Sequence, residues 1–241
     1  MTAKRSEIQA RKDTILAIVV NEYIKTVNPV GSHAITEDYH LDVSPATVRN
    51  ILAELEEEGY LSHPHTSAGR MPTQRGYRYY VDHLMNEIQL LDGEKKRLES
   101  EYKRYVDQLE LLMEKTSQVI SDITQYTSII TLDDGNKLIC RGTNHVAGYP
   151  DSINLMKIQA ILRILEEKER LLALINRDLD KRIEVYIGHE MAFKEMDGCS
   201  LAVSRFETNG ISGRIAVLGP TRMQYARVVS ALDYISELLS R

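Results

Sequence analysis

This chain of 241 residues has no excess of positive charge, only two cysteines and no long apolar run. A formal net charge of −5 excludes a protein coated with cations. It does not exclude a local cationic face that binds DNA, because phosphate contact depends on where the cations lie. Without a run of about 18 apolar residues, a membrane-spanning helix is not expected. The two cysteines, Cys140 and Cys199, lack CxxC spacing. A disulfide between them stays open, but we expect free thiols in a reducing cytoplasm.

The N-terminal segment "MTAKRSEIQARK" carries basic residues but no apolar core or cleavage site, so we expect no secretory signal peptide and a cytoplasmic protein. Hydrophobic residues make up 43% of the chain and charged residues 27%, as in ordinary soluble proteins. This length can hold one large domain or two smaller ones.

The first 85 residues follow the order of a winged helix-turn-helix. Ser32 is expected to cap a second helix, Ser44 and Pro45 mark the start of a third, and Gly59 ends it. The expected elements are helices over 7–27, 33–39 and 45–58, two short strands within 60–73, and a further helix from 74. We therefore predict a winged-helix domain over residues 1–85.

The third helix is oriented by an apolar stripe of Val48, Leu52 and Leu55. In helix-turn-helix proteins the N-terminal part of this helix reads bases in the major groove. Asn50 can pair with adenine and Arg49 with guanine or phosphate, while the wing supplies donors for the backbone or minor groove. The residues predicted to contact DNA are Ser44, Ala46, Thr47, Arg49, Asn50, His63, His65, Thr66, Ser67, Arg70, Arg75 and Arg78. The same features would also suit a winged helix that contacts only proteins.

Acidic residues crowd the far end of the same helix, where a phosphate backbone would repel them. They are Glu54, Glu56, Glu57 and Glu58. Because they follow the reading end by more than a turn, we expect them to face solvent and to discourage a wrong, tail-first docking.

From residue 88 to 126, mostly apolar residues recur at alternating spacings of three and four, which is a heptad seam. Asp92 and Gly93 interrupt it, so we expect an unbroken helix over about 94–126, roughly 50 Å long. It would be a coiled-coil arm or a long helix packed on a domain. The seam predicts a partner helix without specifying whose. We assign residues 86–126 to this linker helix.

The remaining residues, 127–241, alternate strands and helices in the manner of a compact α+β domain. The expected elements are strands over 127–132 and 137–142, a helix over 153–176, three strands reading "IEVYIG", "SLAVSRFE" and "GRIAVLG", and a closing helix over 221–240. Thr221 is expected to cap this last helix. The alternative is that Thr221 and Arg222 hold an anion or close a regulatory pocket.

Catalytic signatures and phosphate-binding glycine loops are missing from the sequence, so we expect no enzyme and no cofactor. His63 and His65 have no acid or cysteine at ligand spacing, and we therefore expect no metal site.

Several blocks of the sequence resemble the bacterial heat-inducible transcription repressor HrcA. The blocks are "NPVGS", "VSPATVRN", "LEEEGYLSHPHTSAGRMPTQRGYRYYVDHL" and "GRIAVLGPTRMQYARVVSALDYISELL". The resemblance implies a dimeric repressor that binds the inverted-repeat operator called CIRCE ahead of chaperone genes. It also implies a small GAF-like C-terminal domain and activity assisted by the GroEL chaperonin. Ser32 and His33 join the predicted DNA contacts on this ground.

The chain departs from the family pattern in two places. His33 stands where the family usually has arginine, which would weaken one phosphate contact. Between the linker helix and the "GTN" motif, the chain also lacks a long segment that includes an inserted dimerisation domain. We therefore expect an abbreviated GAF-like domain and a homodimer built on the heptad helix. The residues predicted for this seam are Leu98, Tyr102, Tyr105, Leu109, Leu112 and Val119.

The sequence thus predicts an α+β multidomain repressor that binds double-stranded DNA and is released on heat stress. One alternative is a winged-helix regulator controlled by a small ligand in the C-terminal domain. The other is a protein-interaction adaptor without a DNA role.

Overall fold

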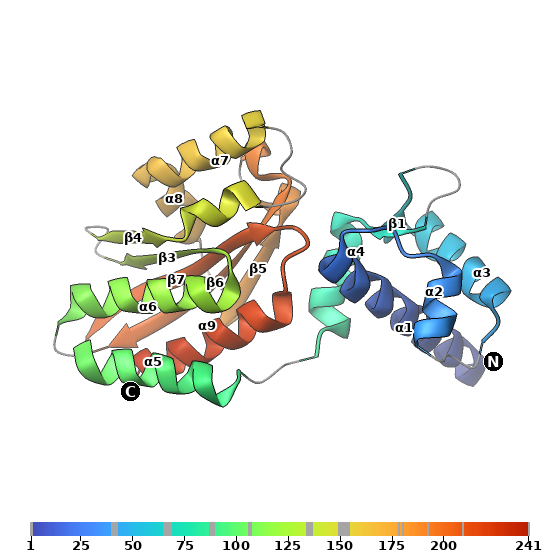
Figure 1. Cartoon of the computed structure of the whole chain (residues 1–241), viewed down its shortest axis with the longest axis horizontal. Coiled ribbons are helices and arrows are strands. Elements are labelled where there is room, and N and C mark those ends of the chain that lie inside the picture. Colours follow the sequence, from blue (N-terminus) through green and yellow to red (C-terminus); the bar gives the residue numbers. More distant parts are fainter. Residues whose placement is uncertain are drawn as a thin grey trace. The chain divides into compact units, whose positions relative to one another are not determined.

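The computed structural model divides the chain into two units, Met1–Asn86 and Glu87–Arg241 (Figure 1). The residues it describes are 2–39, 43–64, 69–86, 90–105, 108–133, 137–148, 155–177, 179, 181–191, 193–208 and 210–240. Within these ranges, no helix is both long and apolar enough to cross a membrane.

The first unit has the predicted order of a winged helix-turn-helix. Its elements are α1 (Thr2–Thr26), α2 (Ser32–Asp38), α3 (Pro45–Glu57), β1 (Leu61–Ser62), β2 (Met71–Pro72), α4 (Gln74–Tyr79) and the π-helical turn η1 (Tyr80–Leu84). Strands β1 and β2 pair antiparallel, with Leu61 opposite Pro72. An isolated antiparallel bridge between Val30 and Arg70 adds the segment before α2 to this small sheet.

Local signals set both ends of α3. The Ser44 hydroxyl accepts a hydrogen bond from the amide of Thr47, and Pro45 is the first helical residue. Gly59 takes a left-handed φ of +79°, its amide bonds to the Glu56 carbonyl, and the next amide reaches back to the Leu55 carbonyl. This is a Schellman ending, and it places the wing directly after the helix.

The expected Ser32 cap is wrong. Gly31 is the N-cap of α2, with an extended backbone at φ −90° and ψ 155°, and Ser32 is the first helical residue. The core of the unit lies between α1, α2, α3 and the wing, and the predicted stripe of α3 belongs to it. The buried apolar residues include Ile15, Leu16, Val19, Val20, Ile35, Val48, Ile51, Leu52, Leu55, Leu61, Tyr77 and Tyr80.

Gly76 in α4 packs directly on the backbone of Tyr60. A Cβ at this position would lie 2.2 Å from the Tyr60 carbonyl oxygen. The Gly76→Ala substitution should therefore destabilise the first unit by about 3 kcal/mol, since neither backbone can give way without losing the Thr73 cap of α4. Urea unfolding followed by circular dichroism measures this loss. Gly93→Ala, where a Cβ meets nothing within 4 Å, is the control; an equal effect in both variants would contradict the packing argument.

The heptad segment forms two helices rather than one. These are α5 (Asp92–Tyr105) and α6 (Leu109–Thr124), which pack against each other as a hairpin in the second unit (Figure 1). Gln108, with non-helical φ −126° and ψ 76°, precedes α6. The prediction of one unbroken helix is therefore wrong, because the partner helix that the seam requires comes from the same chain.

This hairpin also corrects the dimer seam. Leu98, Leu112 and Val119 are at most 3% exposed within their own chain, so they have no surface to offer a second copy. Tyr102 and Leu109 are half-buried, and the side chain of Tyr105 lies outside the described residues. The seam assigned to dimerisation is instead part of the core of the second unit.

A five-stranded antiparallel sheet forms the centre of this unit, in the order β4-β3-β7-β6-β5. The strands are β3 (Thr127–Leu132), β4 (Leu138–Arg141), β5 (Ile183–Ile187), β6 (Cys199–Thr208) and β7 (Ile211–Pro220). All five predicted strands are confirmed. The arrangement is that of an α+β domain, as the GAF-like expectation required.

Helices cover both faces of the sheet (Figure 1). The remaining elements are η2 (Thr143–Gly148), α7 (Leu155–Glu166), α8 (Lys168–Ile175), η4 (Gly188–Glu190), η5 (Lys194–Met196) and α9 (Tyr225–Leu239). Ile129 packs in the core under α7 and α8, and the side chains of Leu201 and Leu218 join it there. On the α9 side, buried hydroxyls meet, with Ser204 Oγ 2.7 Å from Ser236 Oγ.

In the second unit, two further helix boundaries differ from the prediction. The expected helix over 153–176 breaks at Glu167, whose φ is −89° and ψ is 97°. The closing helix begins at Tyr225 after the N-cap Gln224, so Thr221 is not its cap. Both cysteines are free thiols, as expected. Burial raises the pKa of Cys140 to about 11, which keeps this thiol protonated.

Candidate nucleic-acid interface

The N-terminal half of α3 presents a polar face made of small and hydrogen-bonding residues. Ala46, Arg49, Asn50 and Ala53 are exposed, whereas the opposite stripe of the helix is buried. Ser44 is exposed and Thr47 is half-buried, and their hydroxyl oxygens lie 3.0 Å apart. Alanine at two exposed positions would let the helix approach a groove closely.

Arg49 and Asn50 are the two side chains of this face that were predicted to contact bases. Within the part of the chain that the structure describes, neither makes a hydrogen bond or an ion pair. A guanidinium can donate a bidentate pair to guanine, and an amide can donate and accept at adenine. Their donors and acceptors are thus available to a ligand.

The acidic end of α3 is exposed, and two of its glutamates are also paired with a lysine of α1. Lys12 Nζ lies 2.7 Å from Glu54 Oε2 and 2.7 Å from Glu58 Oε1. These hydrogen bonds raise the pKa of Lys12. The expectation that these glutamates face solvent is confirmed for Glu54, Glu57 and Glu58, which are exposed, whereas Glu56 is half-buried.

Glu56 has a separate role, because it joins α3 to the wing. Its carboxylate accepts from Arg70 Nη2 at 2.7 Å and forms a second short contact with His63 Nδ1. The three side chains are between 21% and 35% exposed. Two predicted DNA contacts, His63 and Arg70, therefore meet on a carboxylate of the reading helix.

The other predicted contacts are more scattered. The Arg75 guanidinium stacks over the Tyr60 ring, 4.7 Å from its centroid, and remains exposed. Arg78 pairs with Asp82 at 3.3 Å. His33 is exposed and pairs with Glu37 at 3.0 Å. Ser32 is half-buried. The other predicted contacts, His65, Thr66 and Ser67, lie outside the described residues.

Charge is therefore distributed unevenly along α3. The N-terminal half carries Arg49, and three of the four glutamates at the far end are paired with Lys12 or Arg70. Lys12 and Glu56 were not predicted as functional residues. Their partners lie on other elements, so no spacing within the sequence could have identified the pairs.

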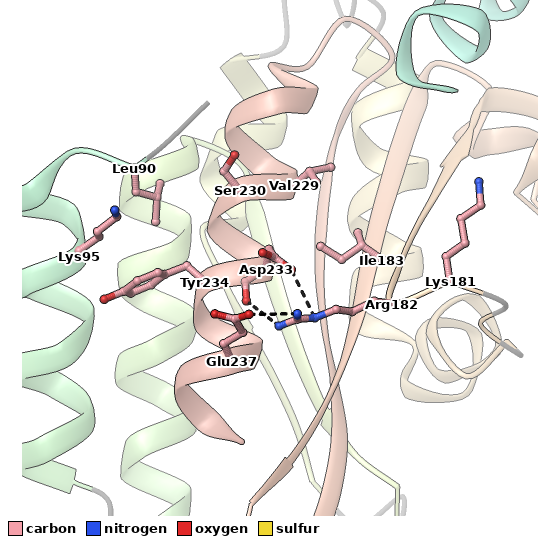
Figure 2. Close-up of a pocket in the computed structure, with 10 residues that line it drawn as sticks. All are labelled: Leu90, Lys95, Lys181, Arg182, Ile183, Val229, Ser230, Asp233, Tyr234 and Glu237. Atoms are coloured by element: carbon pink, nitrogen blue, oxygen red, sulfur yellow. Dashed lines mark hydrogen bonds and ion pairs between the residues drawn. The ribbon is translucent and has the colours of Figure 1, made fainter. Parts of the chain in front are cut away.

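The second unit contains a cavity of about 420 Å³ between α5, α9 and the residues leading into β5 (Figure 2). Arg182 crosses it, with Nη1 3.1 Å from Glu237 Oε1 and Nε 3.3 Å from Asp233 Oδ1. Lys95 Nζ lies 5.9 Å from the centroid of the Tyr234 ring. Arg182 is thus paired within the chain with both carboxylates of the lining, and Lys95 and Lys181 add two further positive charges to it.

A winged helix with an exposed polar face on α3, joined to an α+β unit, is an arrangement typical of transcriptional regulators. The family model described as "HrcA protein C terminal domain" matches residues 130–229. The heat-inducible transcription repressor HrcA of Carboxydothermus hydrogenoformans is 30% identical, and the alignment covers 97% of each chain. Its counterpart from Symbiobacterium thermophilum is 28% identical over 97% of this chain and 98% of its own. This chain belongs to the HrcA family of heat-inducible transcription repressors.

The alignments also confirm that this member is abbreviated. They run over 333 and 334 positions, whereas this chain has 241 residues, so the relatives carry a long segment that is missing here. A crystal structure of a hypothetical protein at 2.2 Å resolution shares the fold, with a TM-score of 0.79 and 18% identity over 95% of this chain and 97% of its own.

Proposed function

We propose that this chain is a DNA-binding repressor of chaperone genes that binds an inverted-repeat operator of the CIRCE type as a homodimer. The observation that carries the proposal is the reading end of α3, where Arg49 and Asn50 are exposed without partners among the described residues. The relatives' names as heat-inducible transcription repressors support it. Ser44, Ala46 and Thr47 would complete the groove-facing surface, and Arg75 would contact phosphate.

An inverted repeat has two-fold symmetry, so two copies of the reading helix must be held one helical turn, or a multiple of it, apart. The homodimer follows from this requirement. Its interface would lie outside Leu98, Leu112 and Val119, because these side chains are buried in their own chain.

Heat would act by loosening a dimer of marginal stability, which lowers operator occupancy as the temperature rises. Assistance by the GroEL chaperonin would then link repression to chaperonin supply. The repressor would work in the cytoplasm, where its operator is, and would need no metal or cofactor.

A fluorescence-anisotropy titration on a labelled inverted repeat tests the proposal. We expect specific binding. The logarithm of its association constant should fall linearly with the logarithm of the salt concentration, with a slope of about −0.9 per phosphate contacted. A duplex with one scrambled half-site is the control and should bind more weakly. Repeating the titration at rising temperature should show occupancy falling before the chain unfolds.

Two results would contradict the proposal. Failure to bind any duplex at low salt would favour a protein-interaction adaptor. A ligand-specific gain in thermal stability, together with ligand-dependent operator binding, would favour a regulator controlled by a small molecule.

A further inference from the structure

Glu56 lies where three segments of the first unit meet. It is on the last turn of α3, His63 follows β1, and Arg70 precedes β2. One carboxylate oxygen contacts His63 Nδ1, and the other lies 2.7 Å from Arg70 Nη2. Both strands of the wing are therefore joined to the reading helix through a single side chain.

Arg70 is also fixed through its backbone. Its amide donates to the Val30 carbonyl at 2.9 Å and its carbonyl accepts from the Val30 amide at 2.8 Å. The preceding Gly69 packs so closely that a Cβ there would lie 2.5 Å from the Val30 carbonyl carbon. Arg70 is therefore held by Val30 through its backbone and by Glu56 through its guanidinium. Its side chain is oriented towards α3 and is only 21% exposed.

We infer that Glu56 is a positioning residue that fixes the wing relative to the reading end of α3. The inference rests on the proposed function and adds to it a residue that does not touch DNA. Glu56 is six residues beyond Asn50, which is about 9 Å along a rigid helix. The wing and Asn50 are thereby presented to the duplex in one geometry, and Arg70 acts at the root of the wing rather than on phosphate.

The ion pairs of Glu56 should affect operator affinity more than the stability of the fold, because they order the wing before DNA binds. Partly exposed ion pairs contribute little to global stability, whereas ordering two strands before binding removes a cost from the binding step. A chain without the Glu56 charge should remain folded but bind its operator less tightly.

The Glu56→Gln and Glu57→Gln variants provide a matched comparison. Each removes one negative charge from the same turn of α3, but Glu57 is exposed and has no partner among the described residues. Binding should weaken about tenfold in Glu56→Gln relative to Glu57→Gln, with a smaller ratio of specific to non-specific affinity. Amide hydrogen exchange near β1, β2 and Val30 should accelerate only in Glu56→Gln.

A charge swap separates positioning from direct phosphate contact. Arg70→Glu should weaken binding, and adding Glu56→Arg should recover most of the specificity ratio by restoring the ion pair. If Arg70 contacts phosphate instead, the double variant will stay as weak as Arg70→Glu, and the inference is overturned. Circular dichroism confirms that each variant is folded.

The outcomes also distinguish this inference from the proposed function. Equal exchange and equal binding in Glu56→Gln and Glu57→Gln, with the parent chain bound to its operator, would overturn the role of Glu56 alone. If the parent chain binds no DNA, the proposed function fails, while the exchange comparison still decides whether Glu56 orders the wing.

Discussion

The Leu98→Glu substitution is expected to unfold the second unit rather than to release a folded monomer. Leu98 is 2% exposed on α5, which packs against α6 and α9. Losing a buried leucine costs about 2–5 kcal/mol, and the new carboxylate must either be buried at further cost or open the helical layer. Since whole domains are stable by only about 5–15 kcal/mol, little stability would remain.

Urea unfolding followed by circular dichroism, combined with light scattering, tests this expectation. The control is Leu91→Glu, since Leu91 precedes the same helix and is 68% exposed. It should change stability by less than about 0.5 kcal/mol. A folded monomer from Leu98→Glu, with the stability of the parent chain, would restore the dimer seam and contradict the internal hairpin.

The hairpin shows where the sequence pattern stops being informative. A heptad seam indicates that a helix needs an apolar partner, but the pattern is the same whether that partner is a second copy or the same chain. No proline or glycine lies between Tyr105 and Leu109 to mark the reversal. The break at Glu167 is equally unmarked. These turns depend on how the helices fit the sheet, which is a tertiary property.

Helix ends were predictable where the local signals were strong and unopposed. Ser44 with Pro45 begins α3, and Gly59 ends it with a left-handed backbone, as expected. Ser32 and Thr221 are also good capping residues, yet neither caps a helix. Gly31 already has the extended backbone of an N-cap, and Gln224 occupies the corresponding place before α9.

The candidate site also has a part that the sequence could predict and a part that it could not. The exposed face of α3 could be predicted, because a helical period fixes which side chains oppose a buried stripe. The ion pairs of Lys12 and Glu56 could not, because their partners lie on other elements. The glutamates that seemed to oppose DNA binding are largely the residues that brace the reading helix against α1 and the wing.

The Asn50→Ala substitution should cost about 1–3 kcal/mol on the inverted repeat and little on unrelated DNA. Asn50 is exposed and unpartnered within the described residues, so its removal leaves the fold unchanged and deletes only base contacts. Arg49→Ala should cost a similar amount, with part of the loss on phosphate. Anisotropy on both duplexes measures the ratio of specific to non-specific affinity. This ratio should fall by a factor that corresponds to about the same free energy.

Arg75→Ala provides the contrast for this prediction. Arg75 lies beyond the wing, stacked on Tyr60, and is expected to contact phosphate rather than bases. Its removal should weaken binding to all sequences nearly equally and reduce the salt slope by about 1, whereas Asn50→Ala should leave the slope unchanged. If Asn50→Ala lowered the slope and spared the specificity ratio, base reading would have to be assigned to another surface of the first unit.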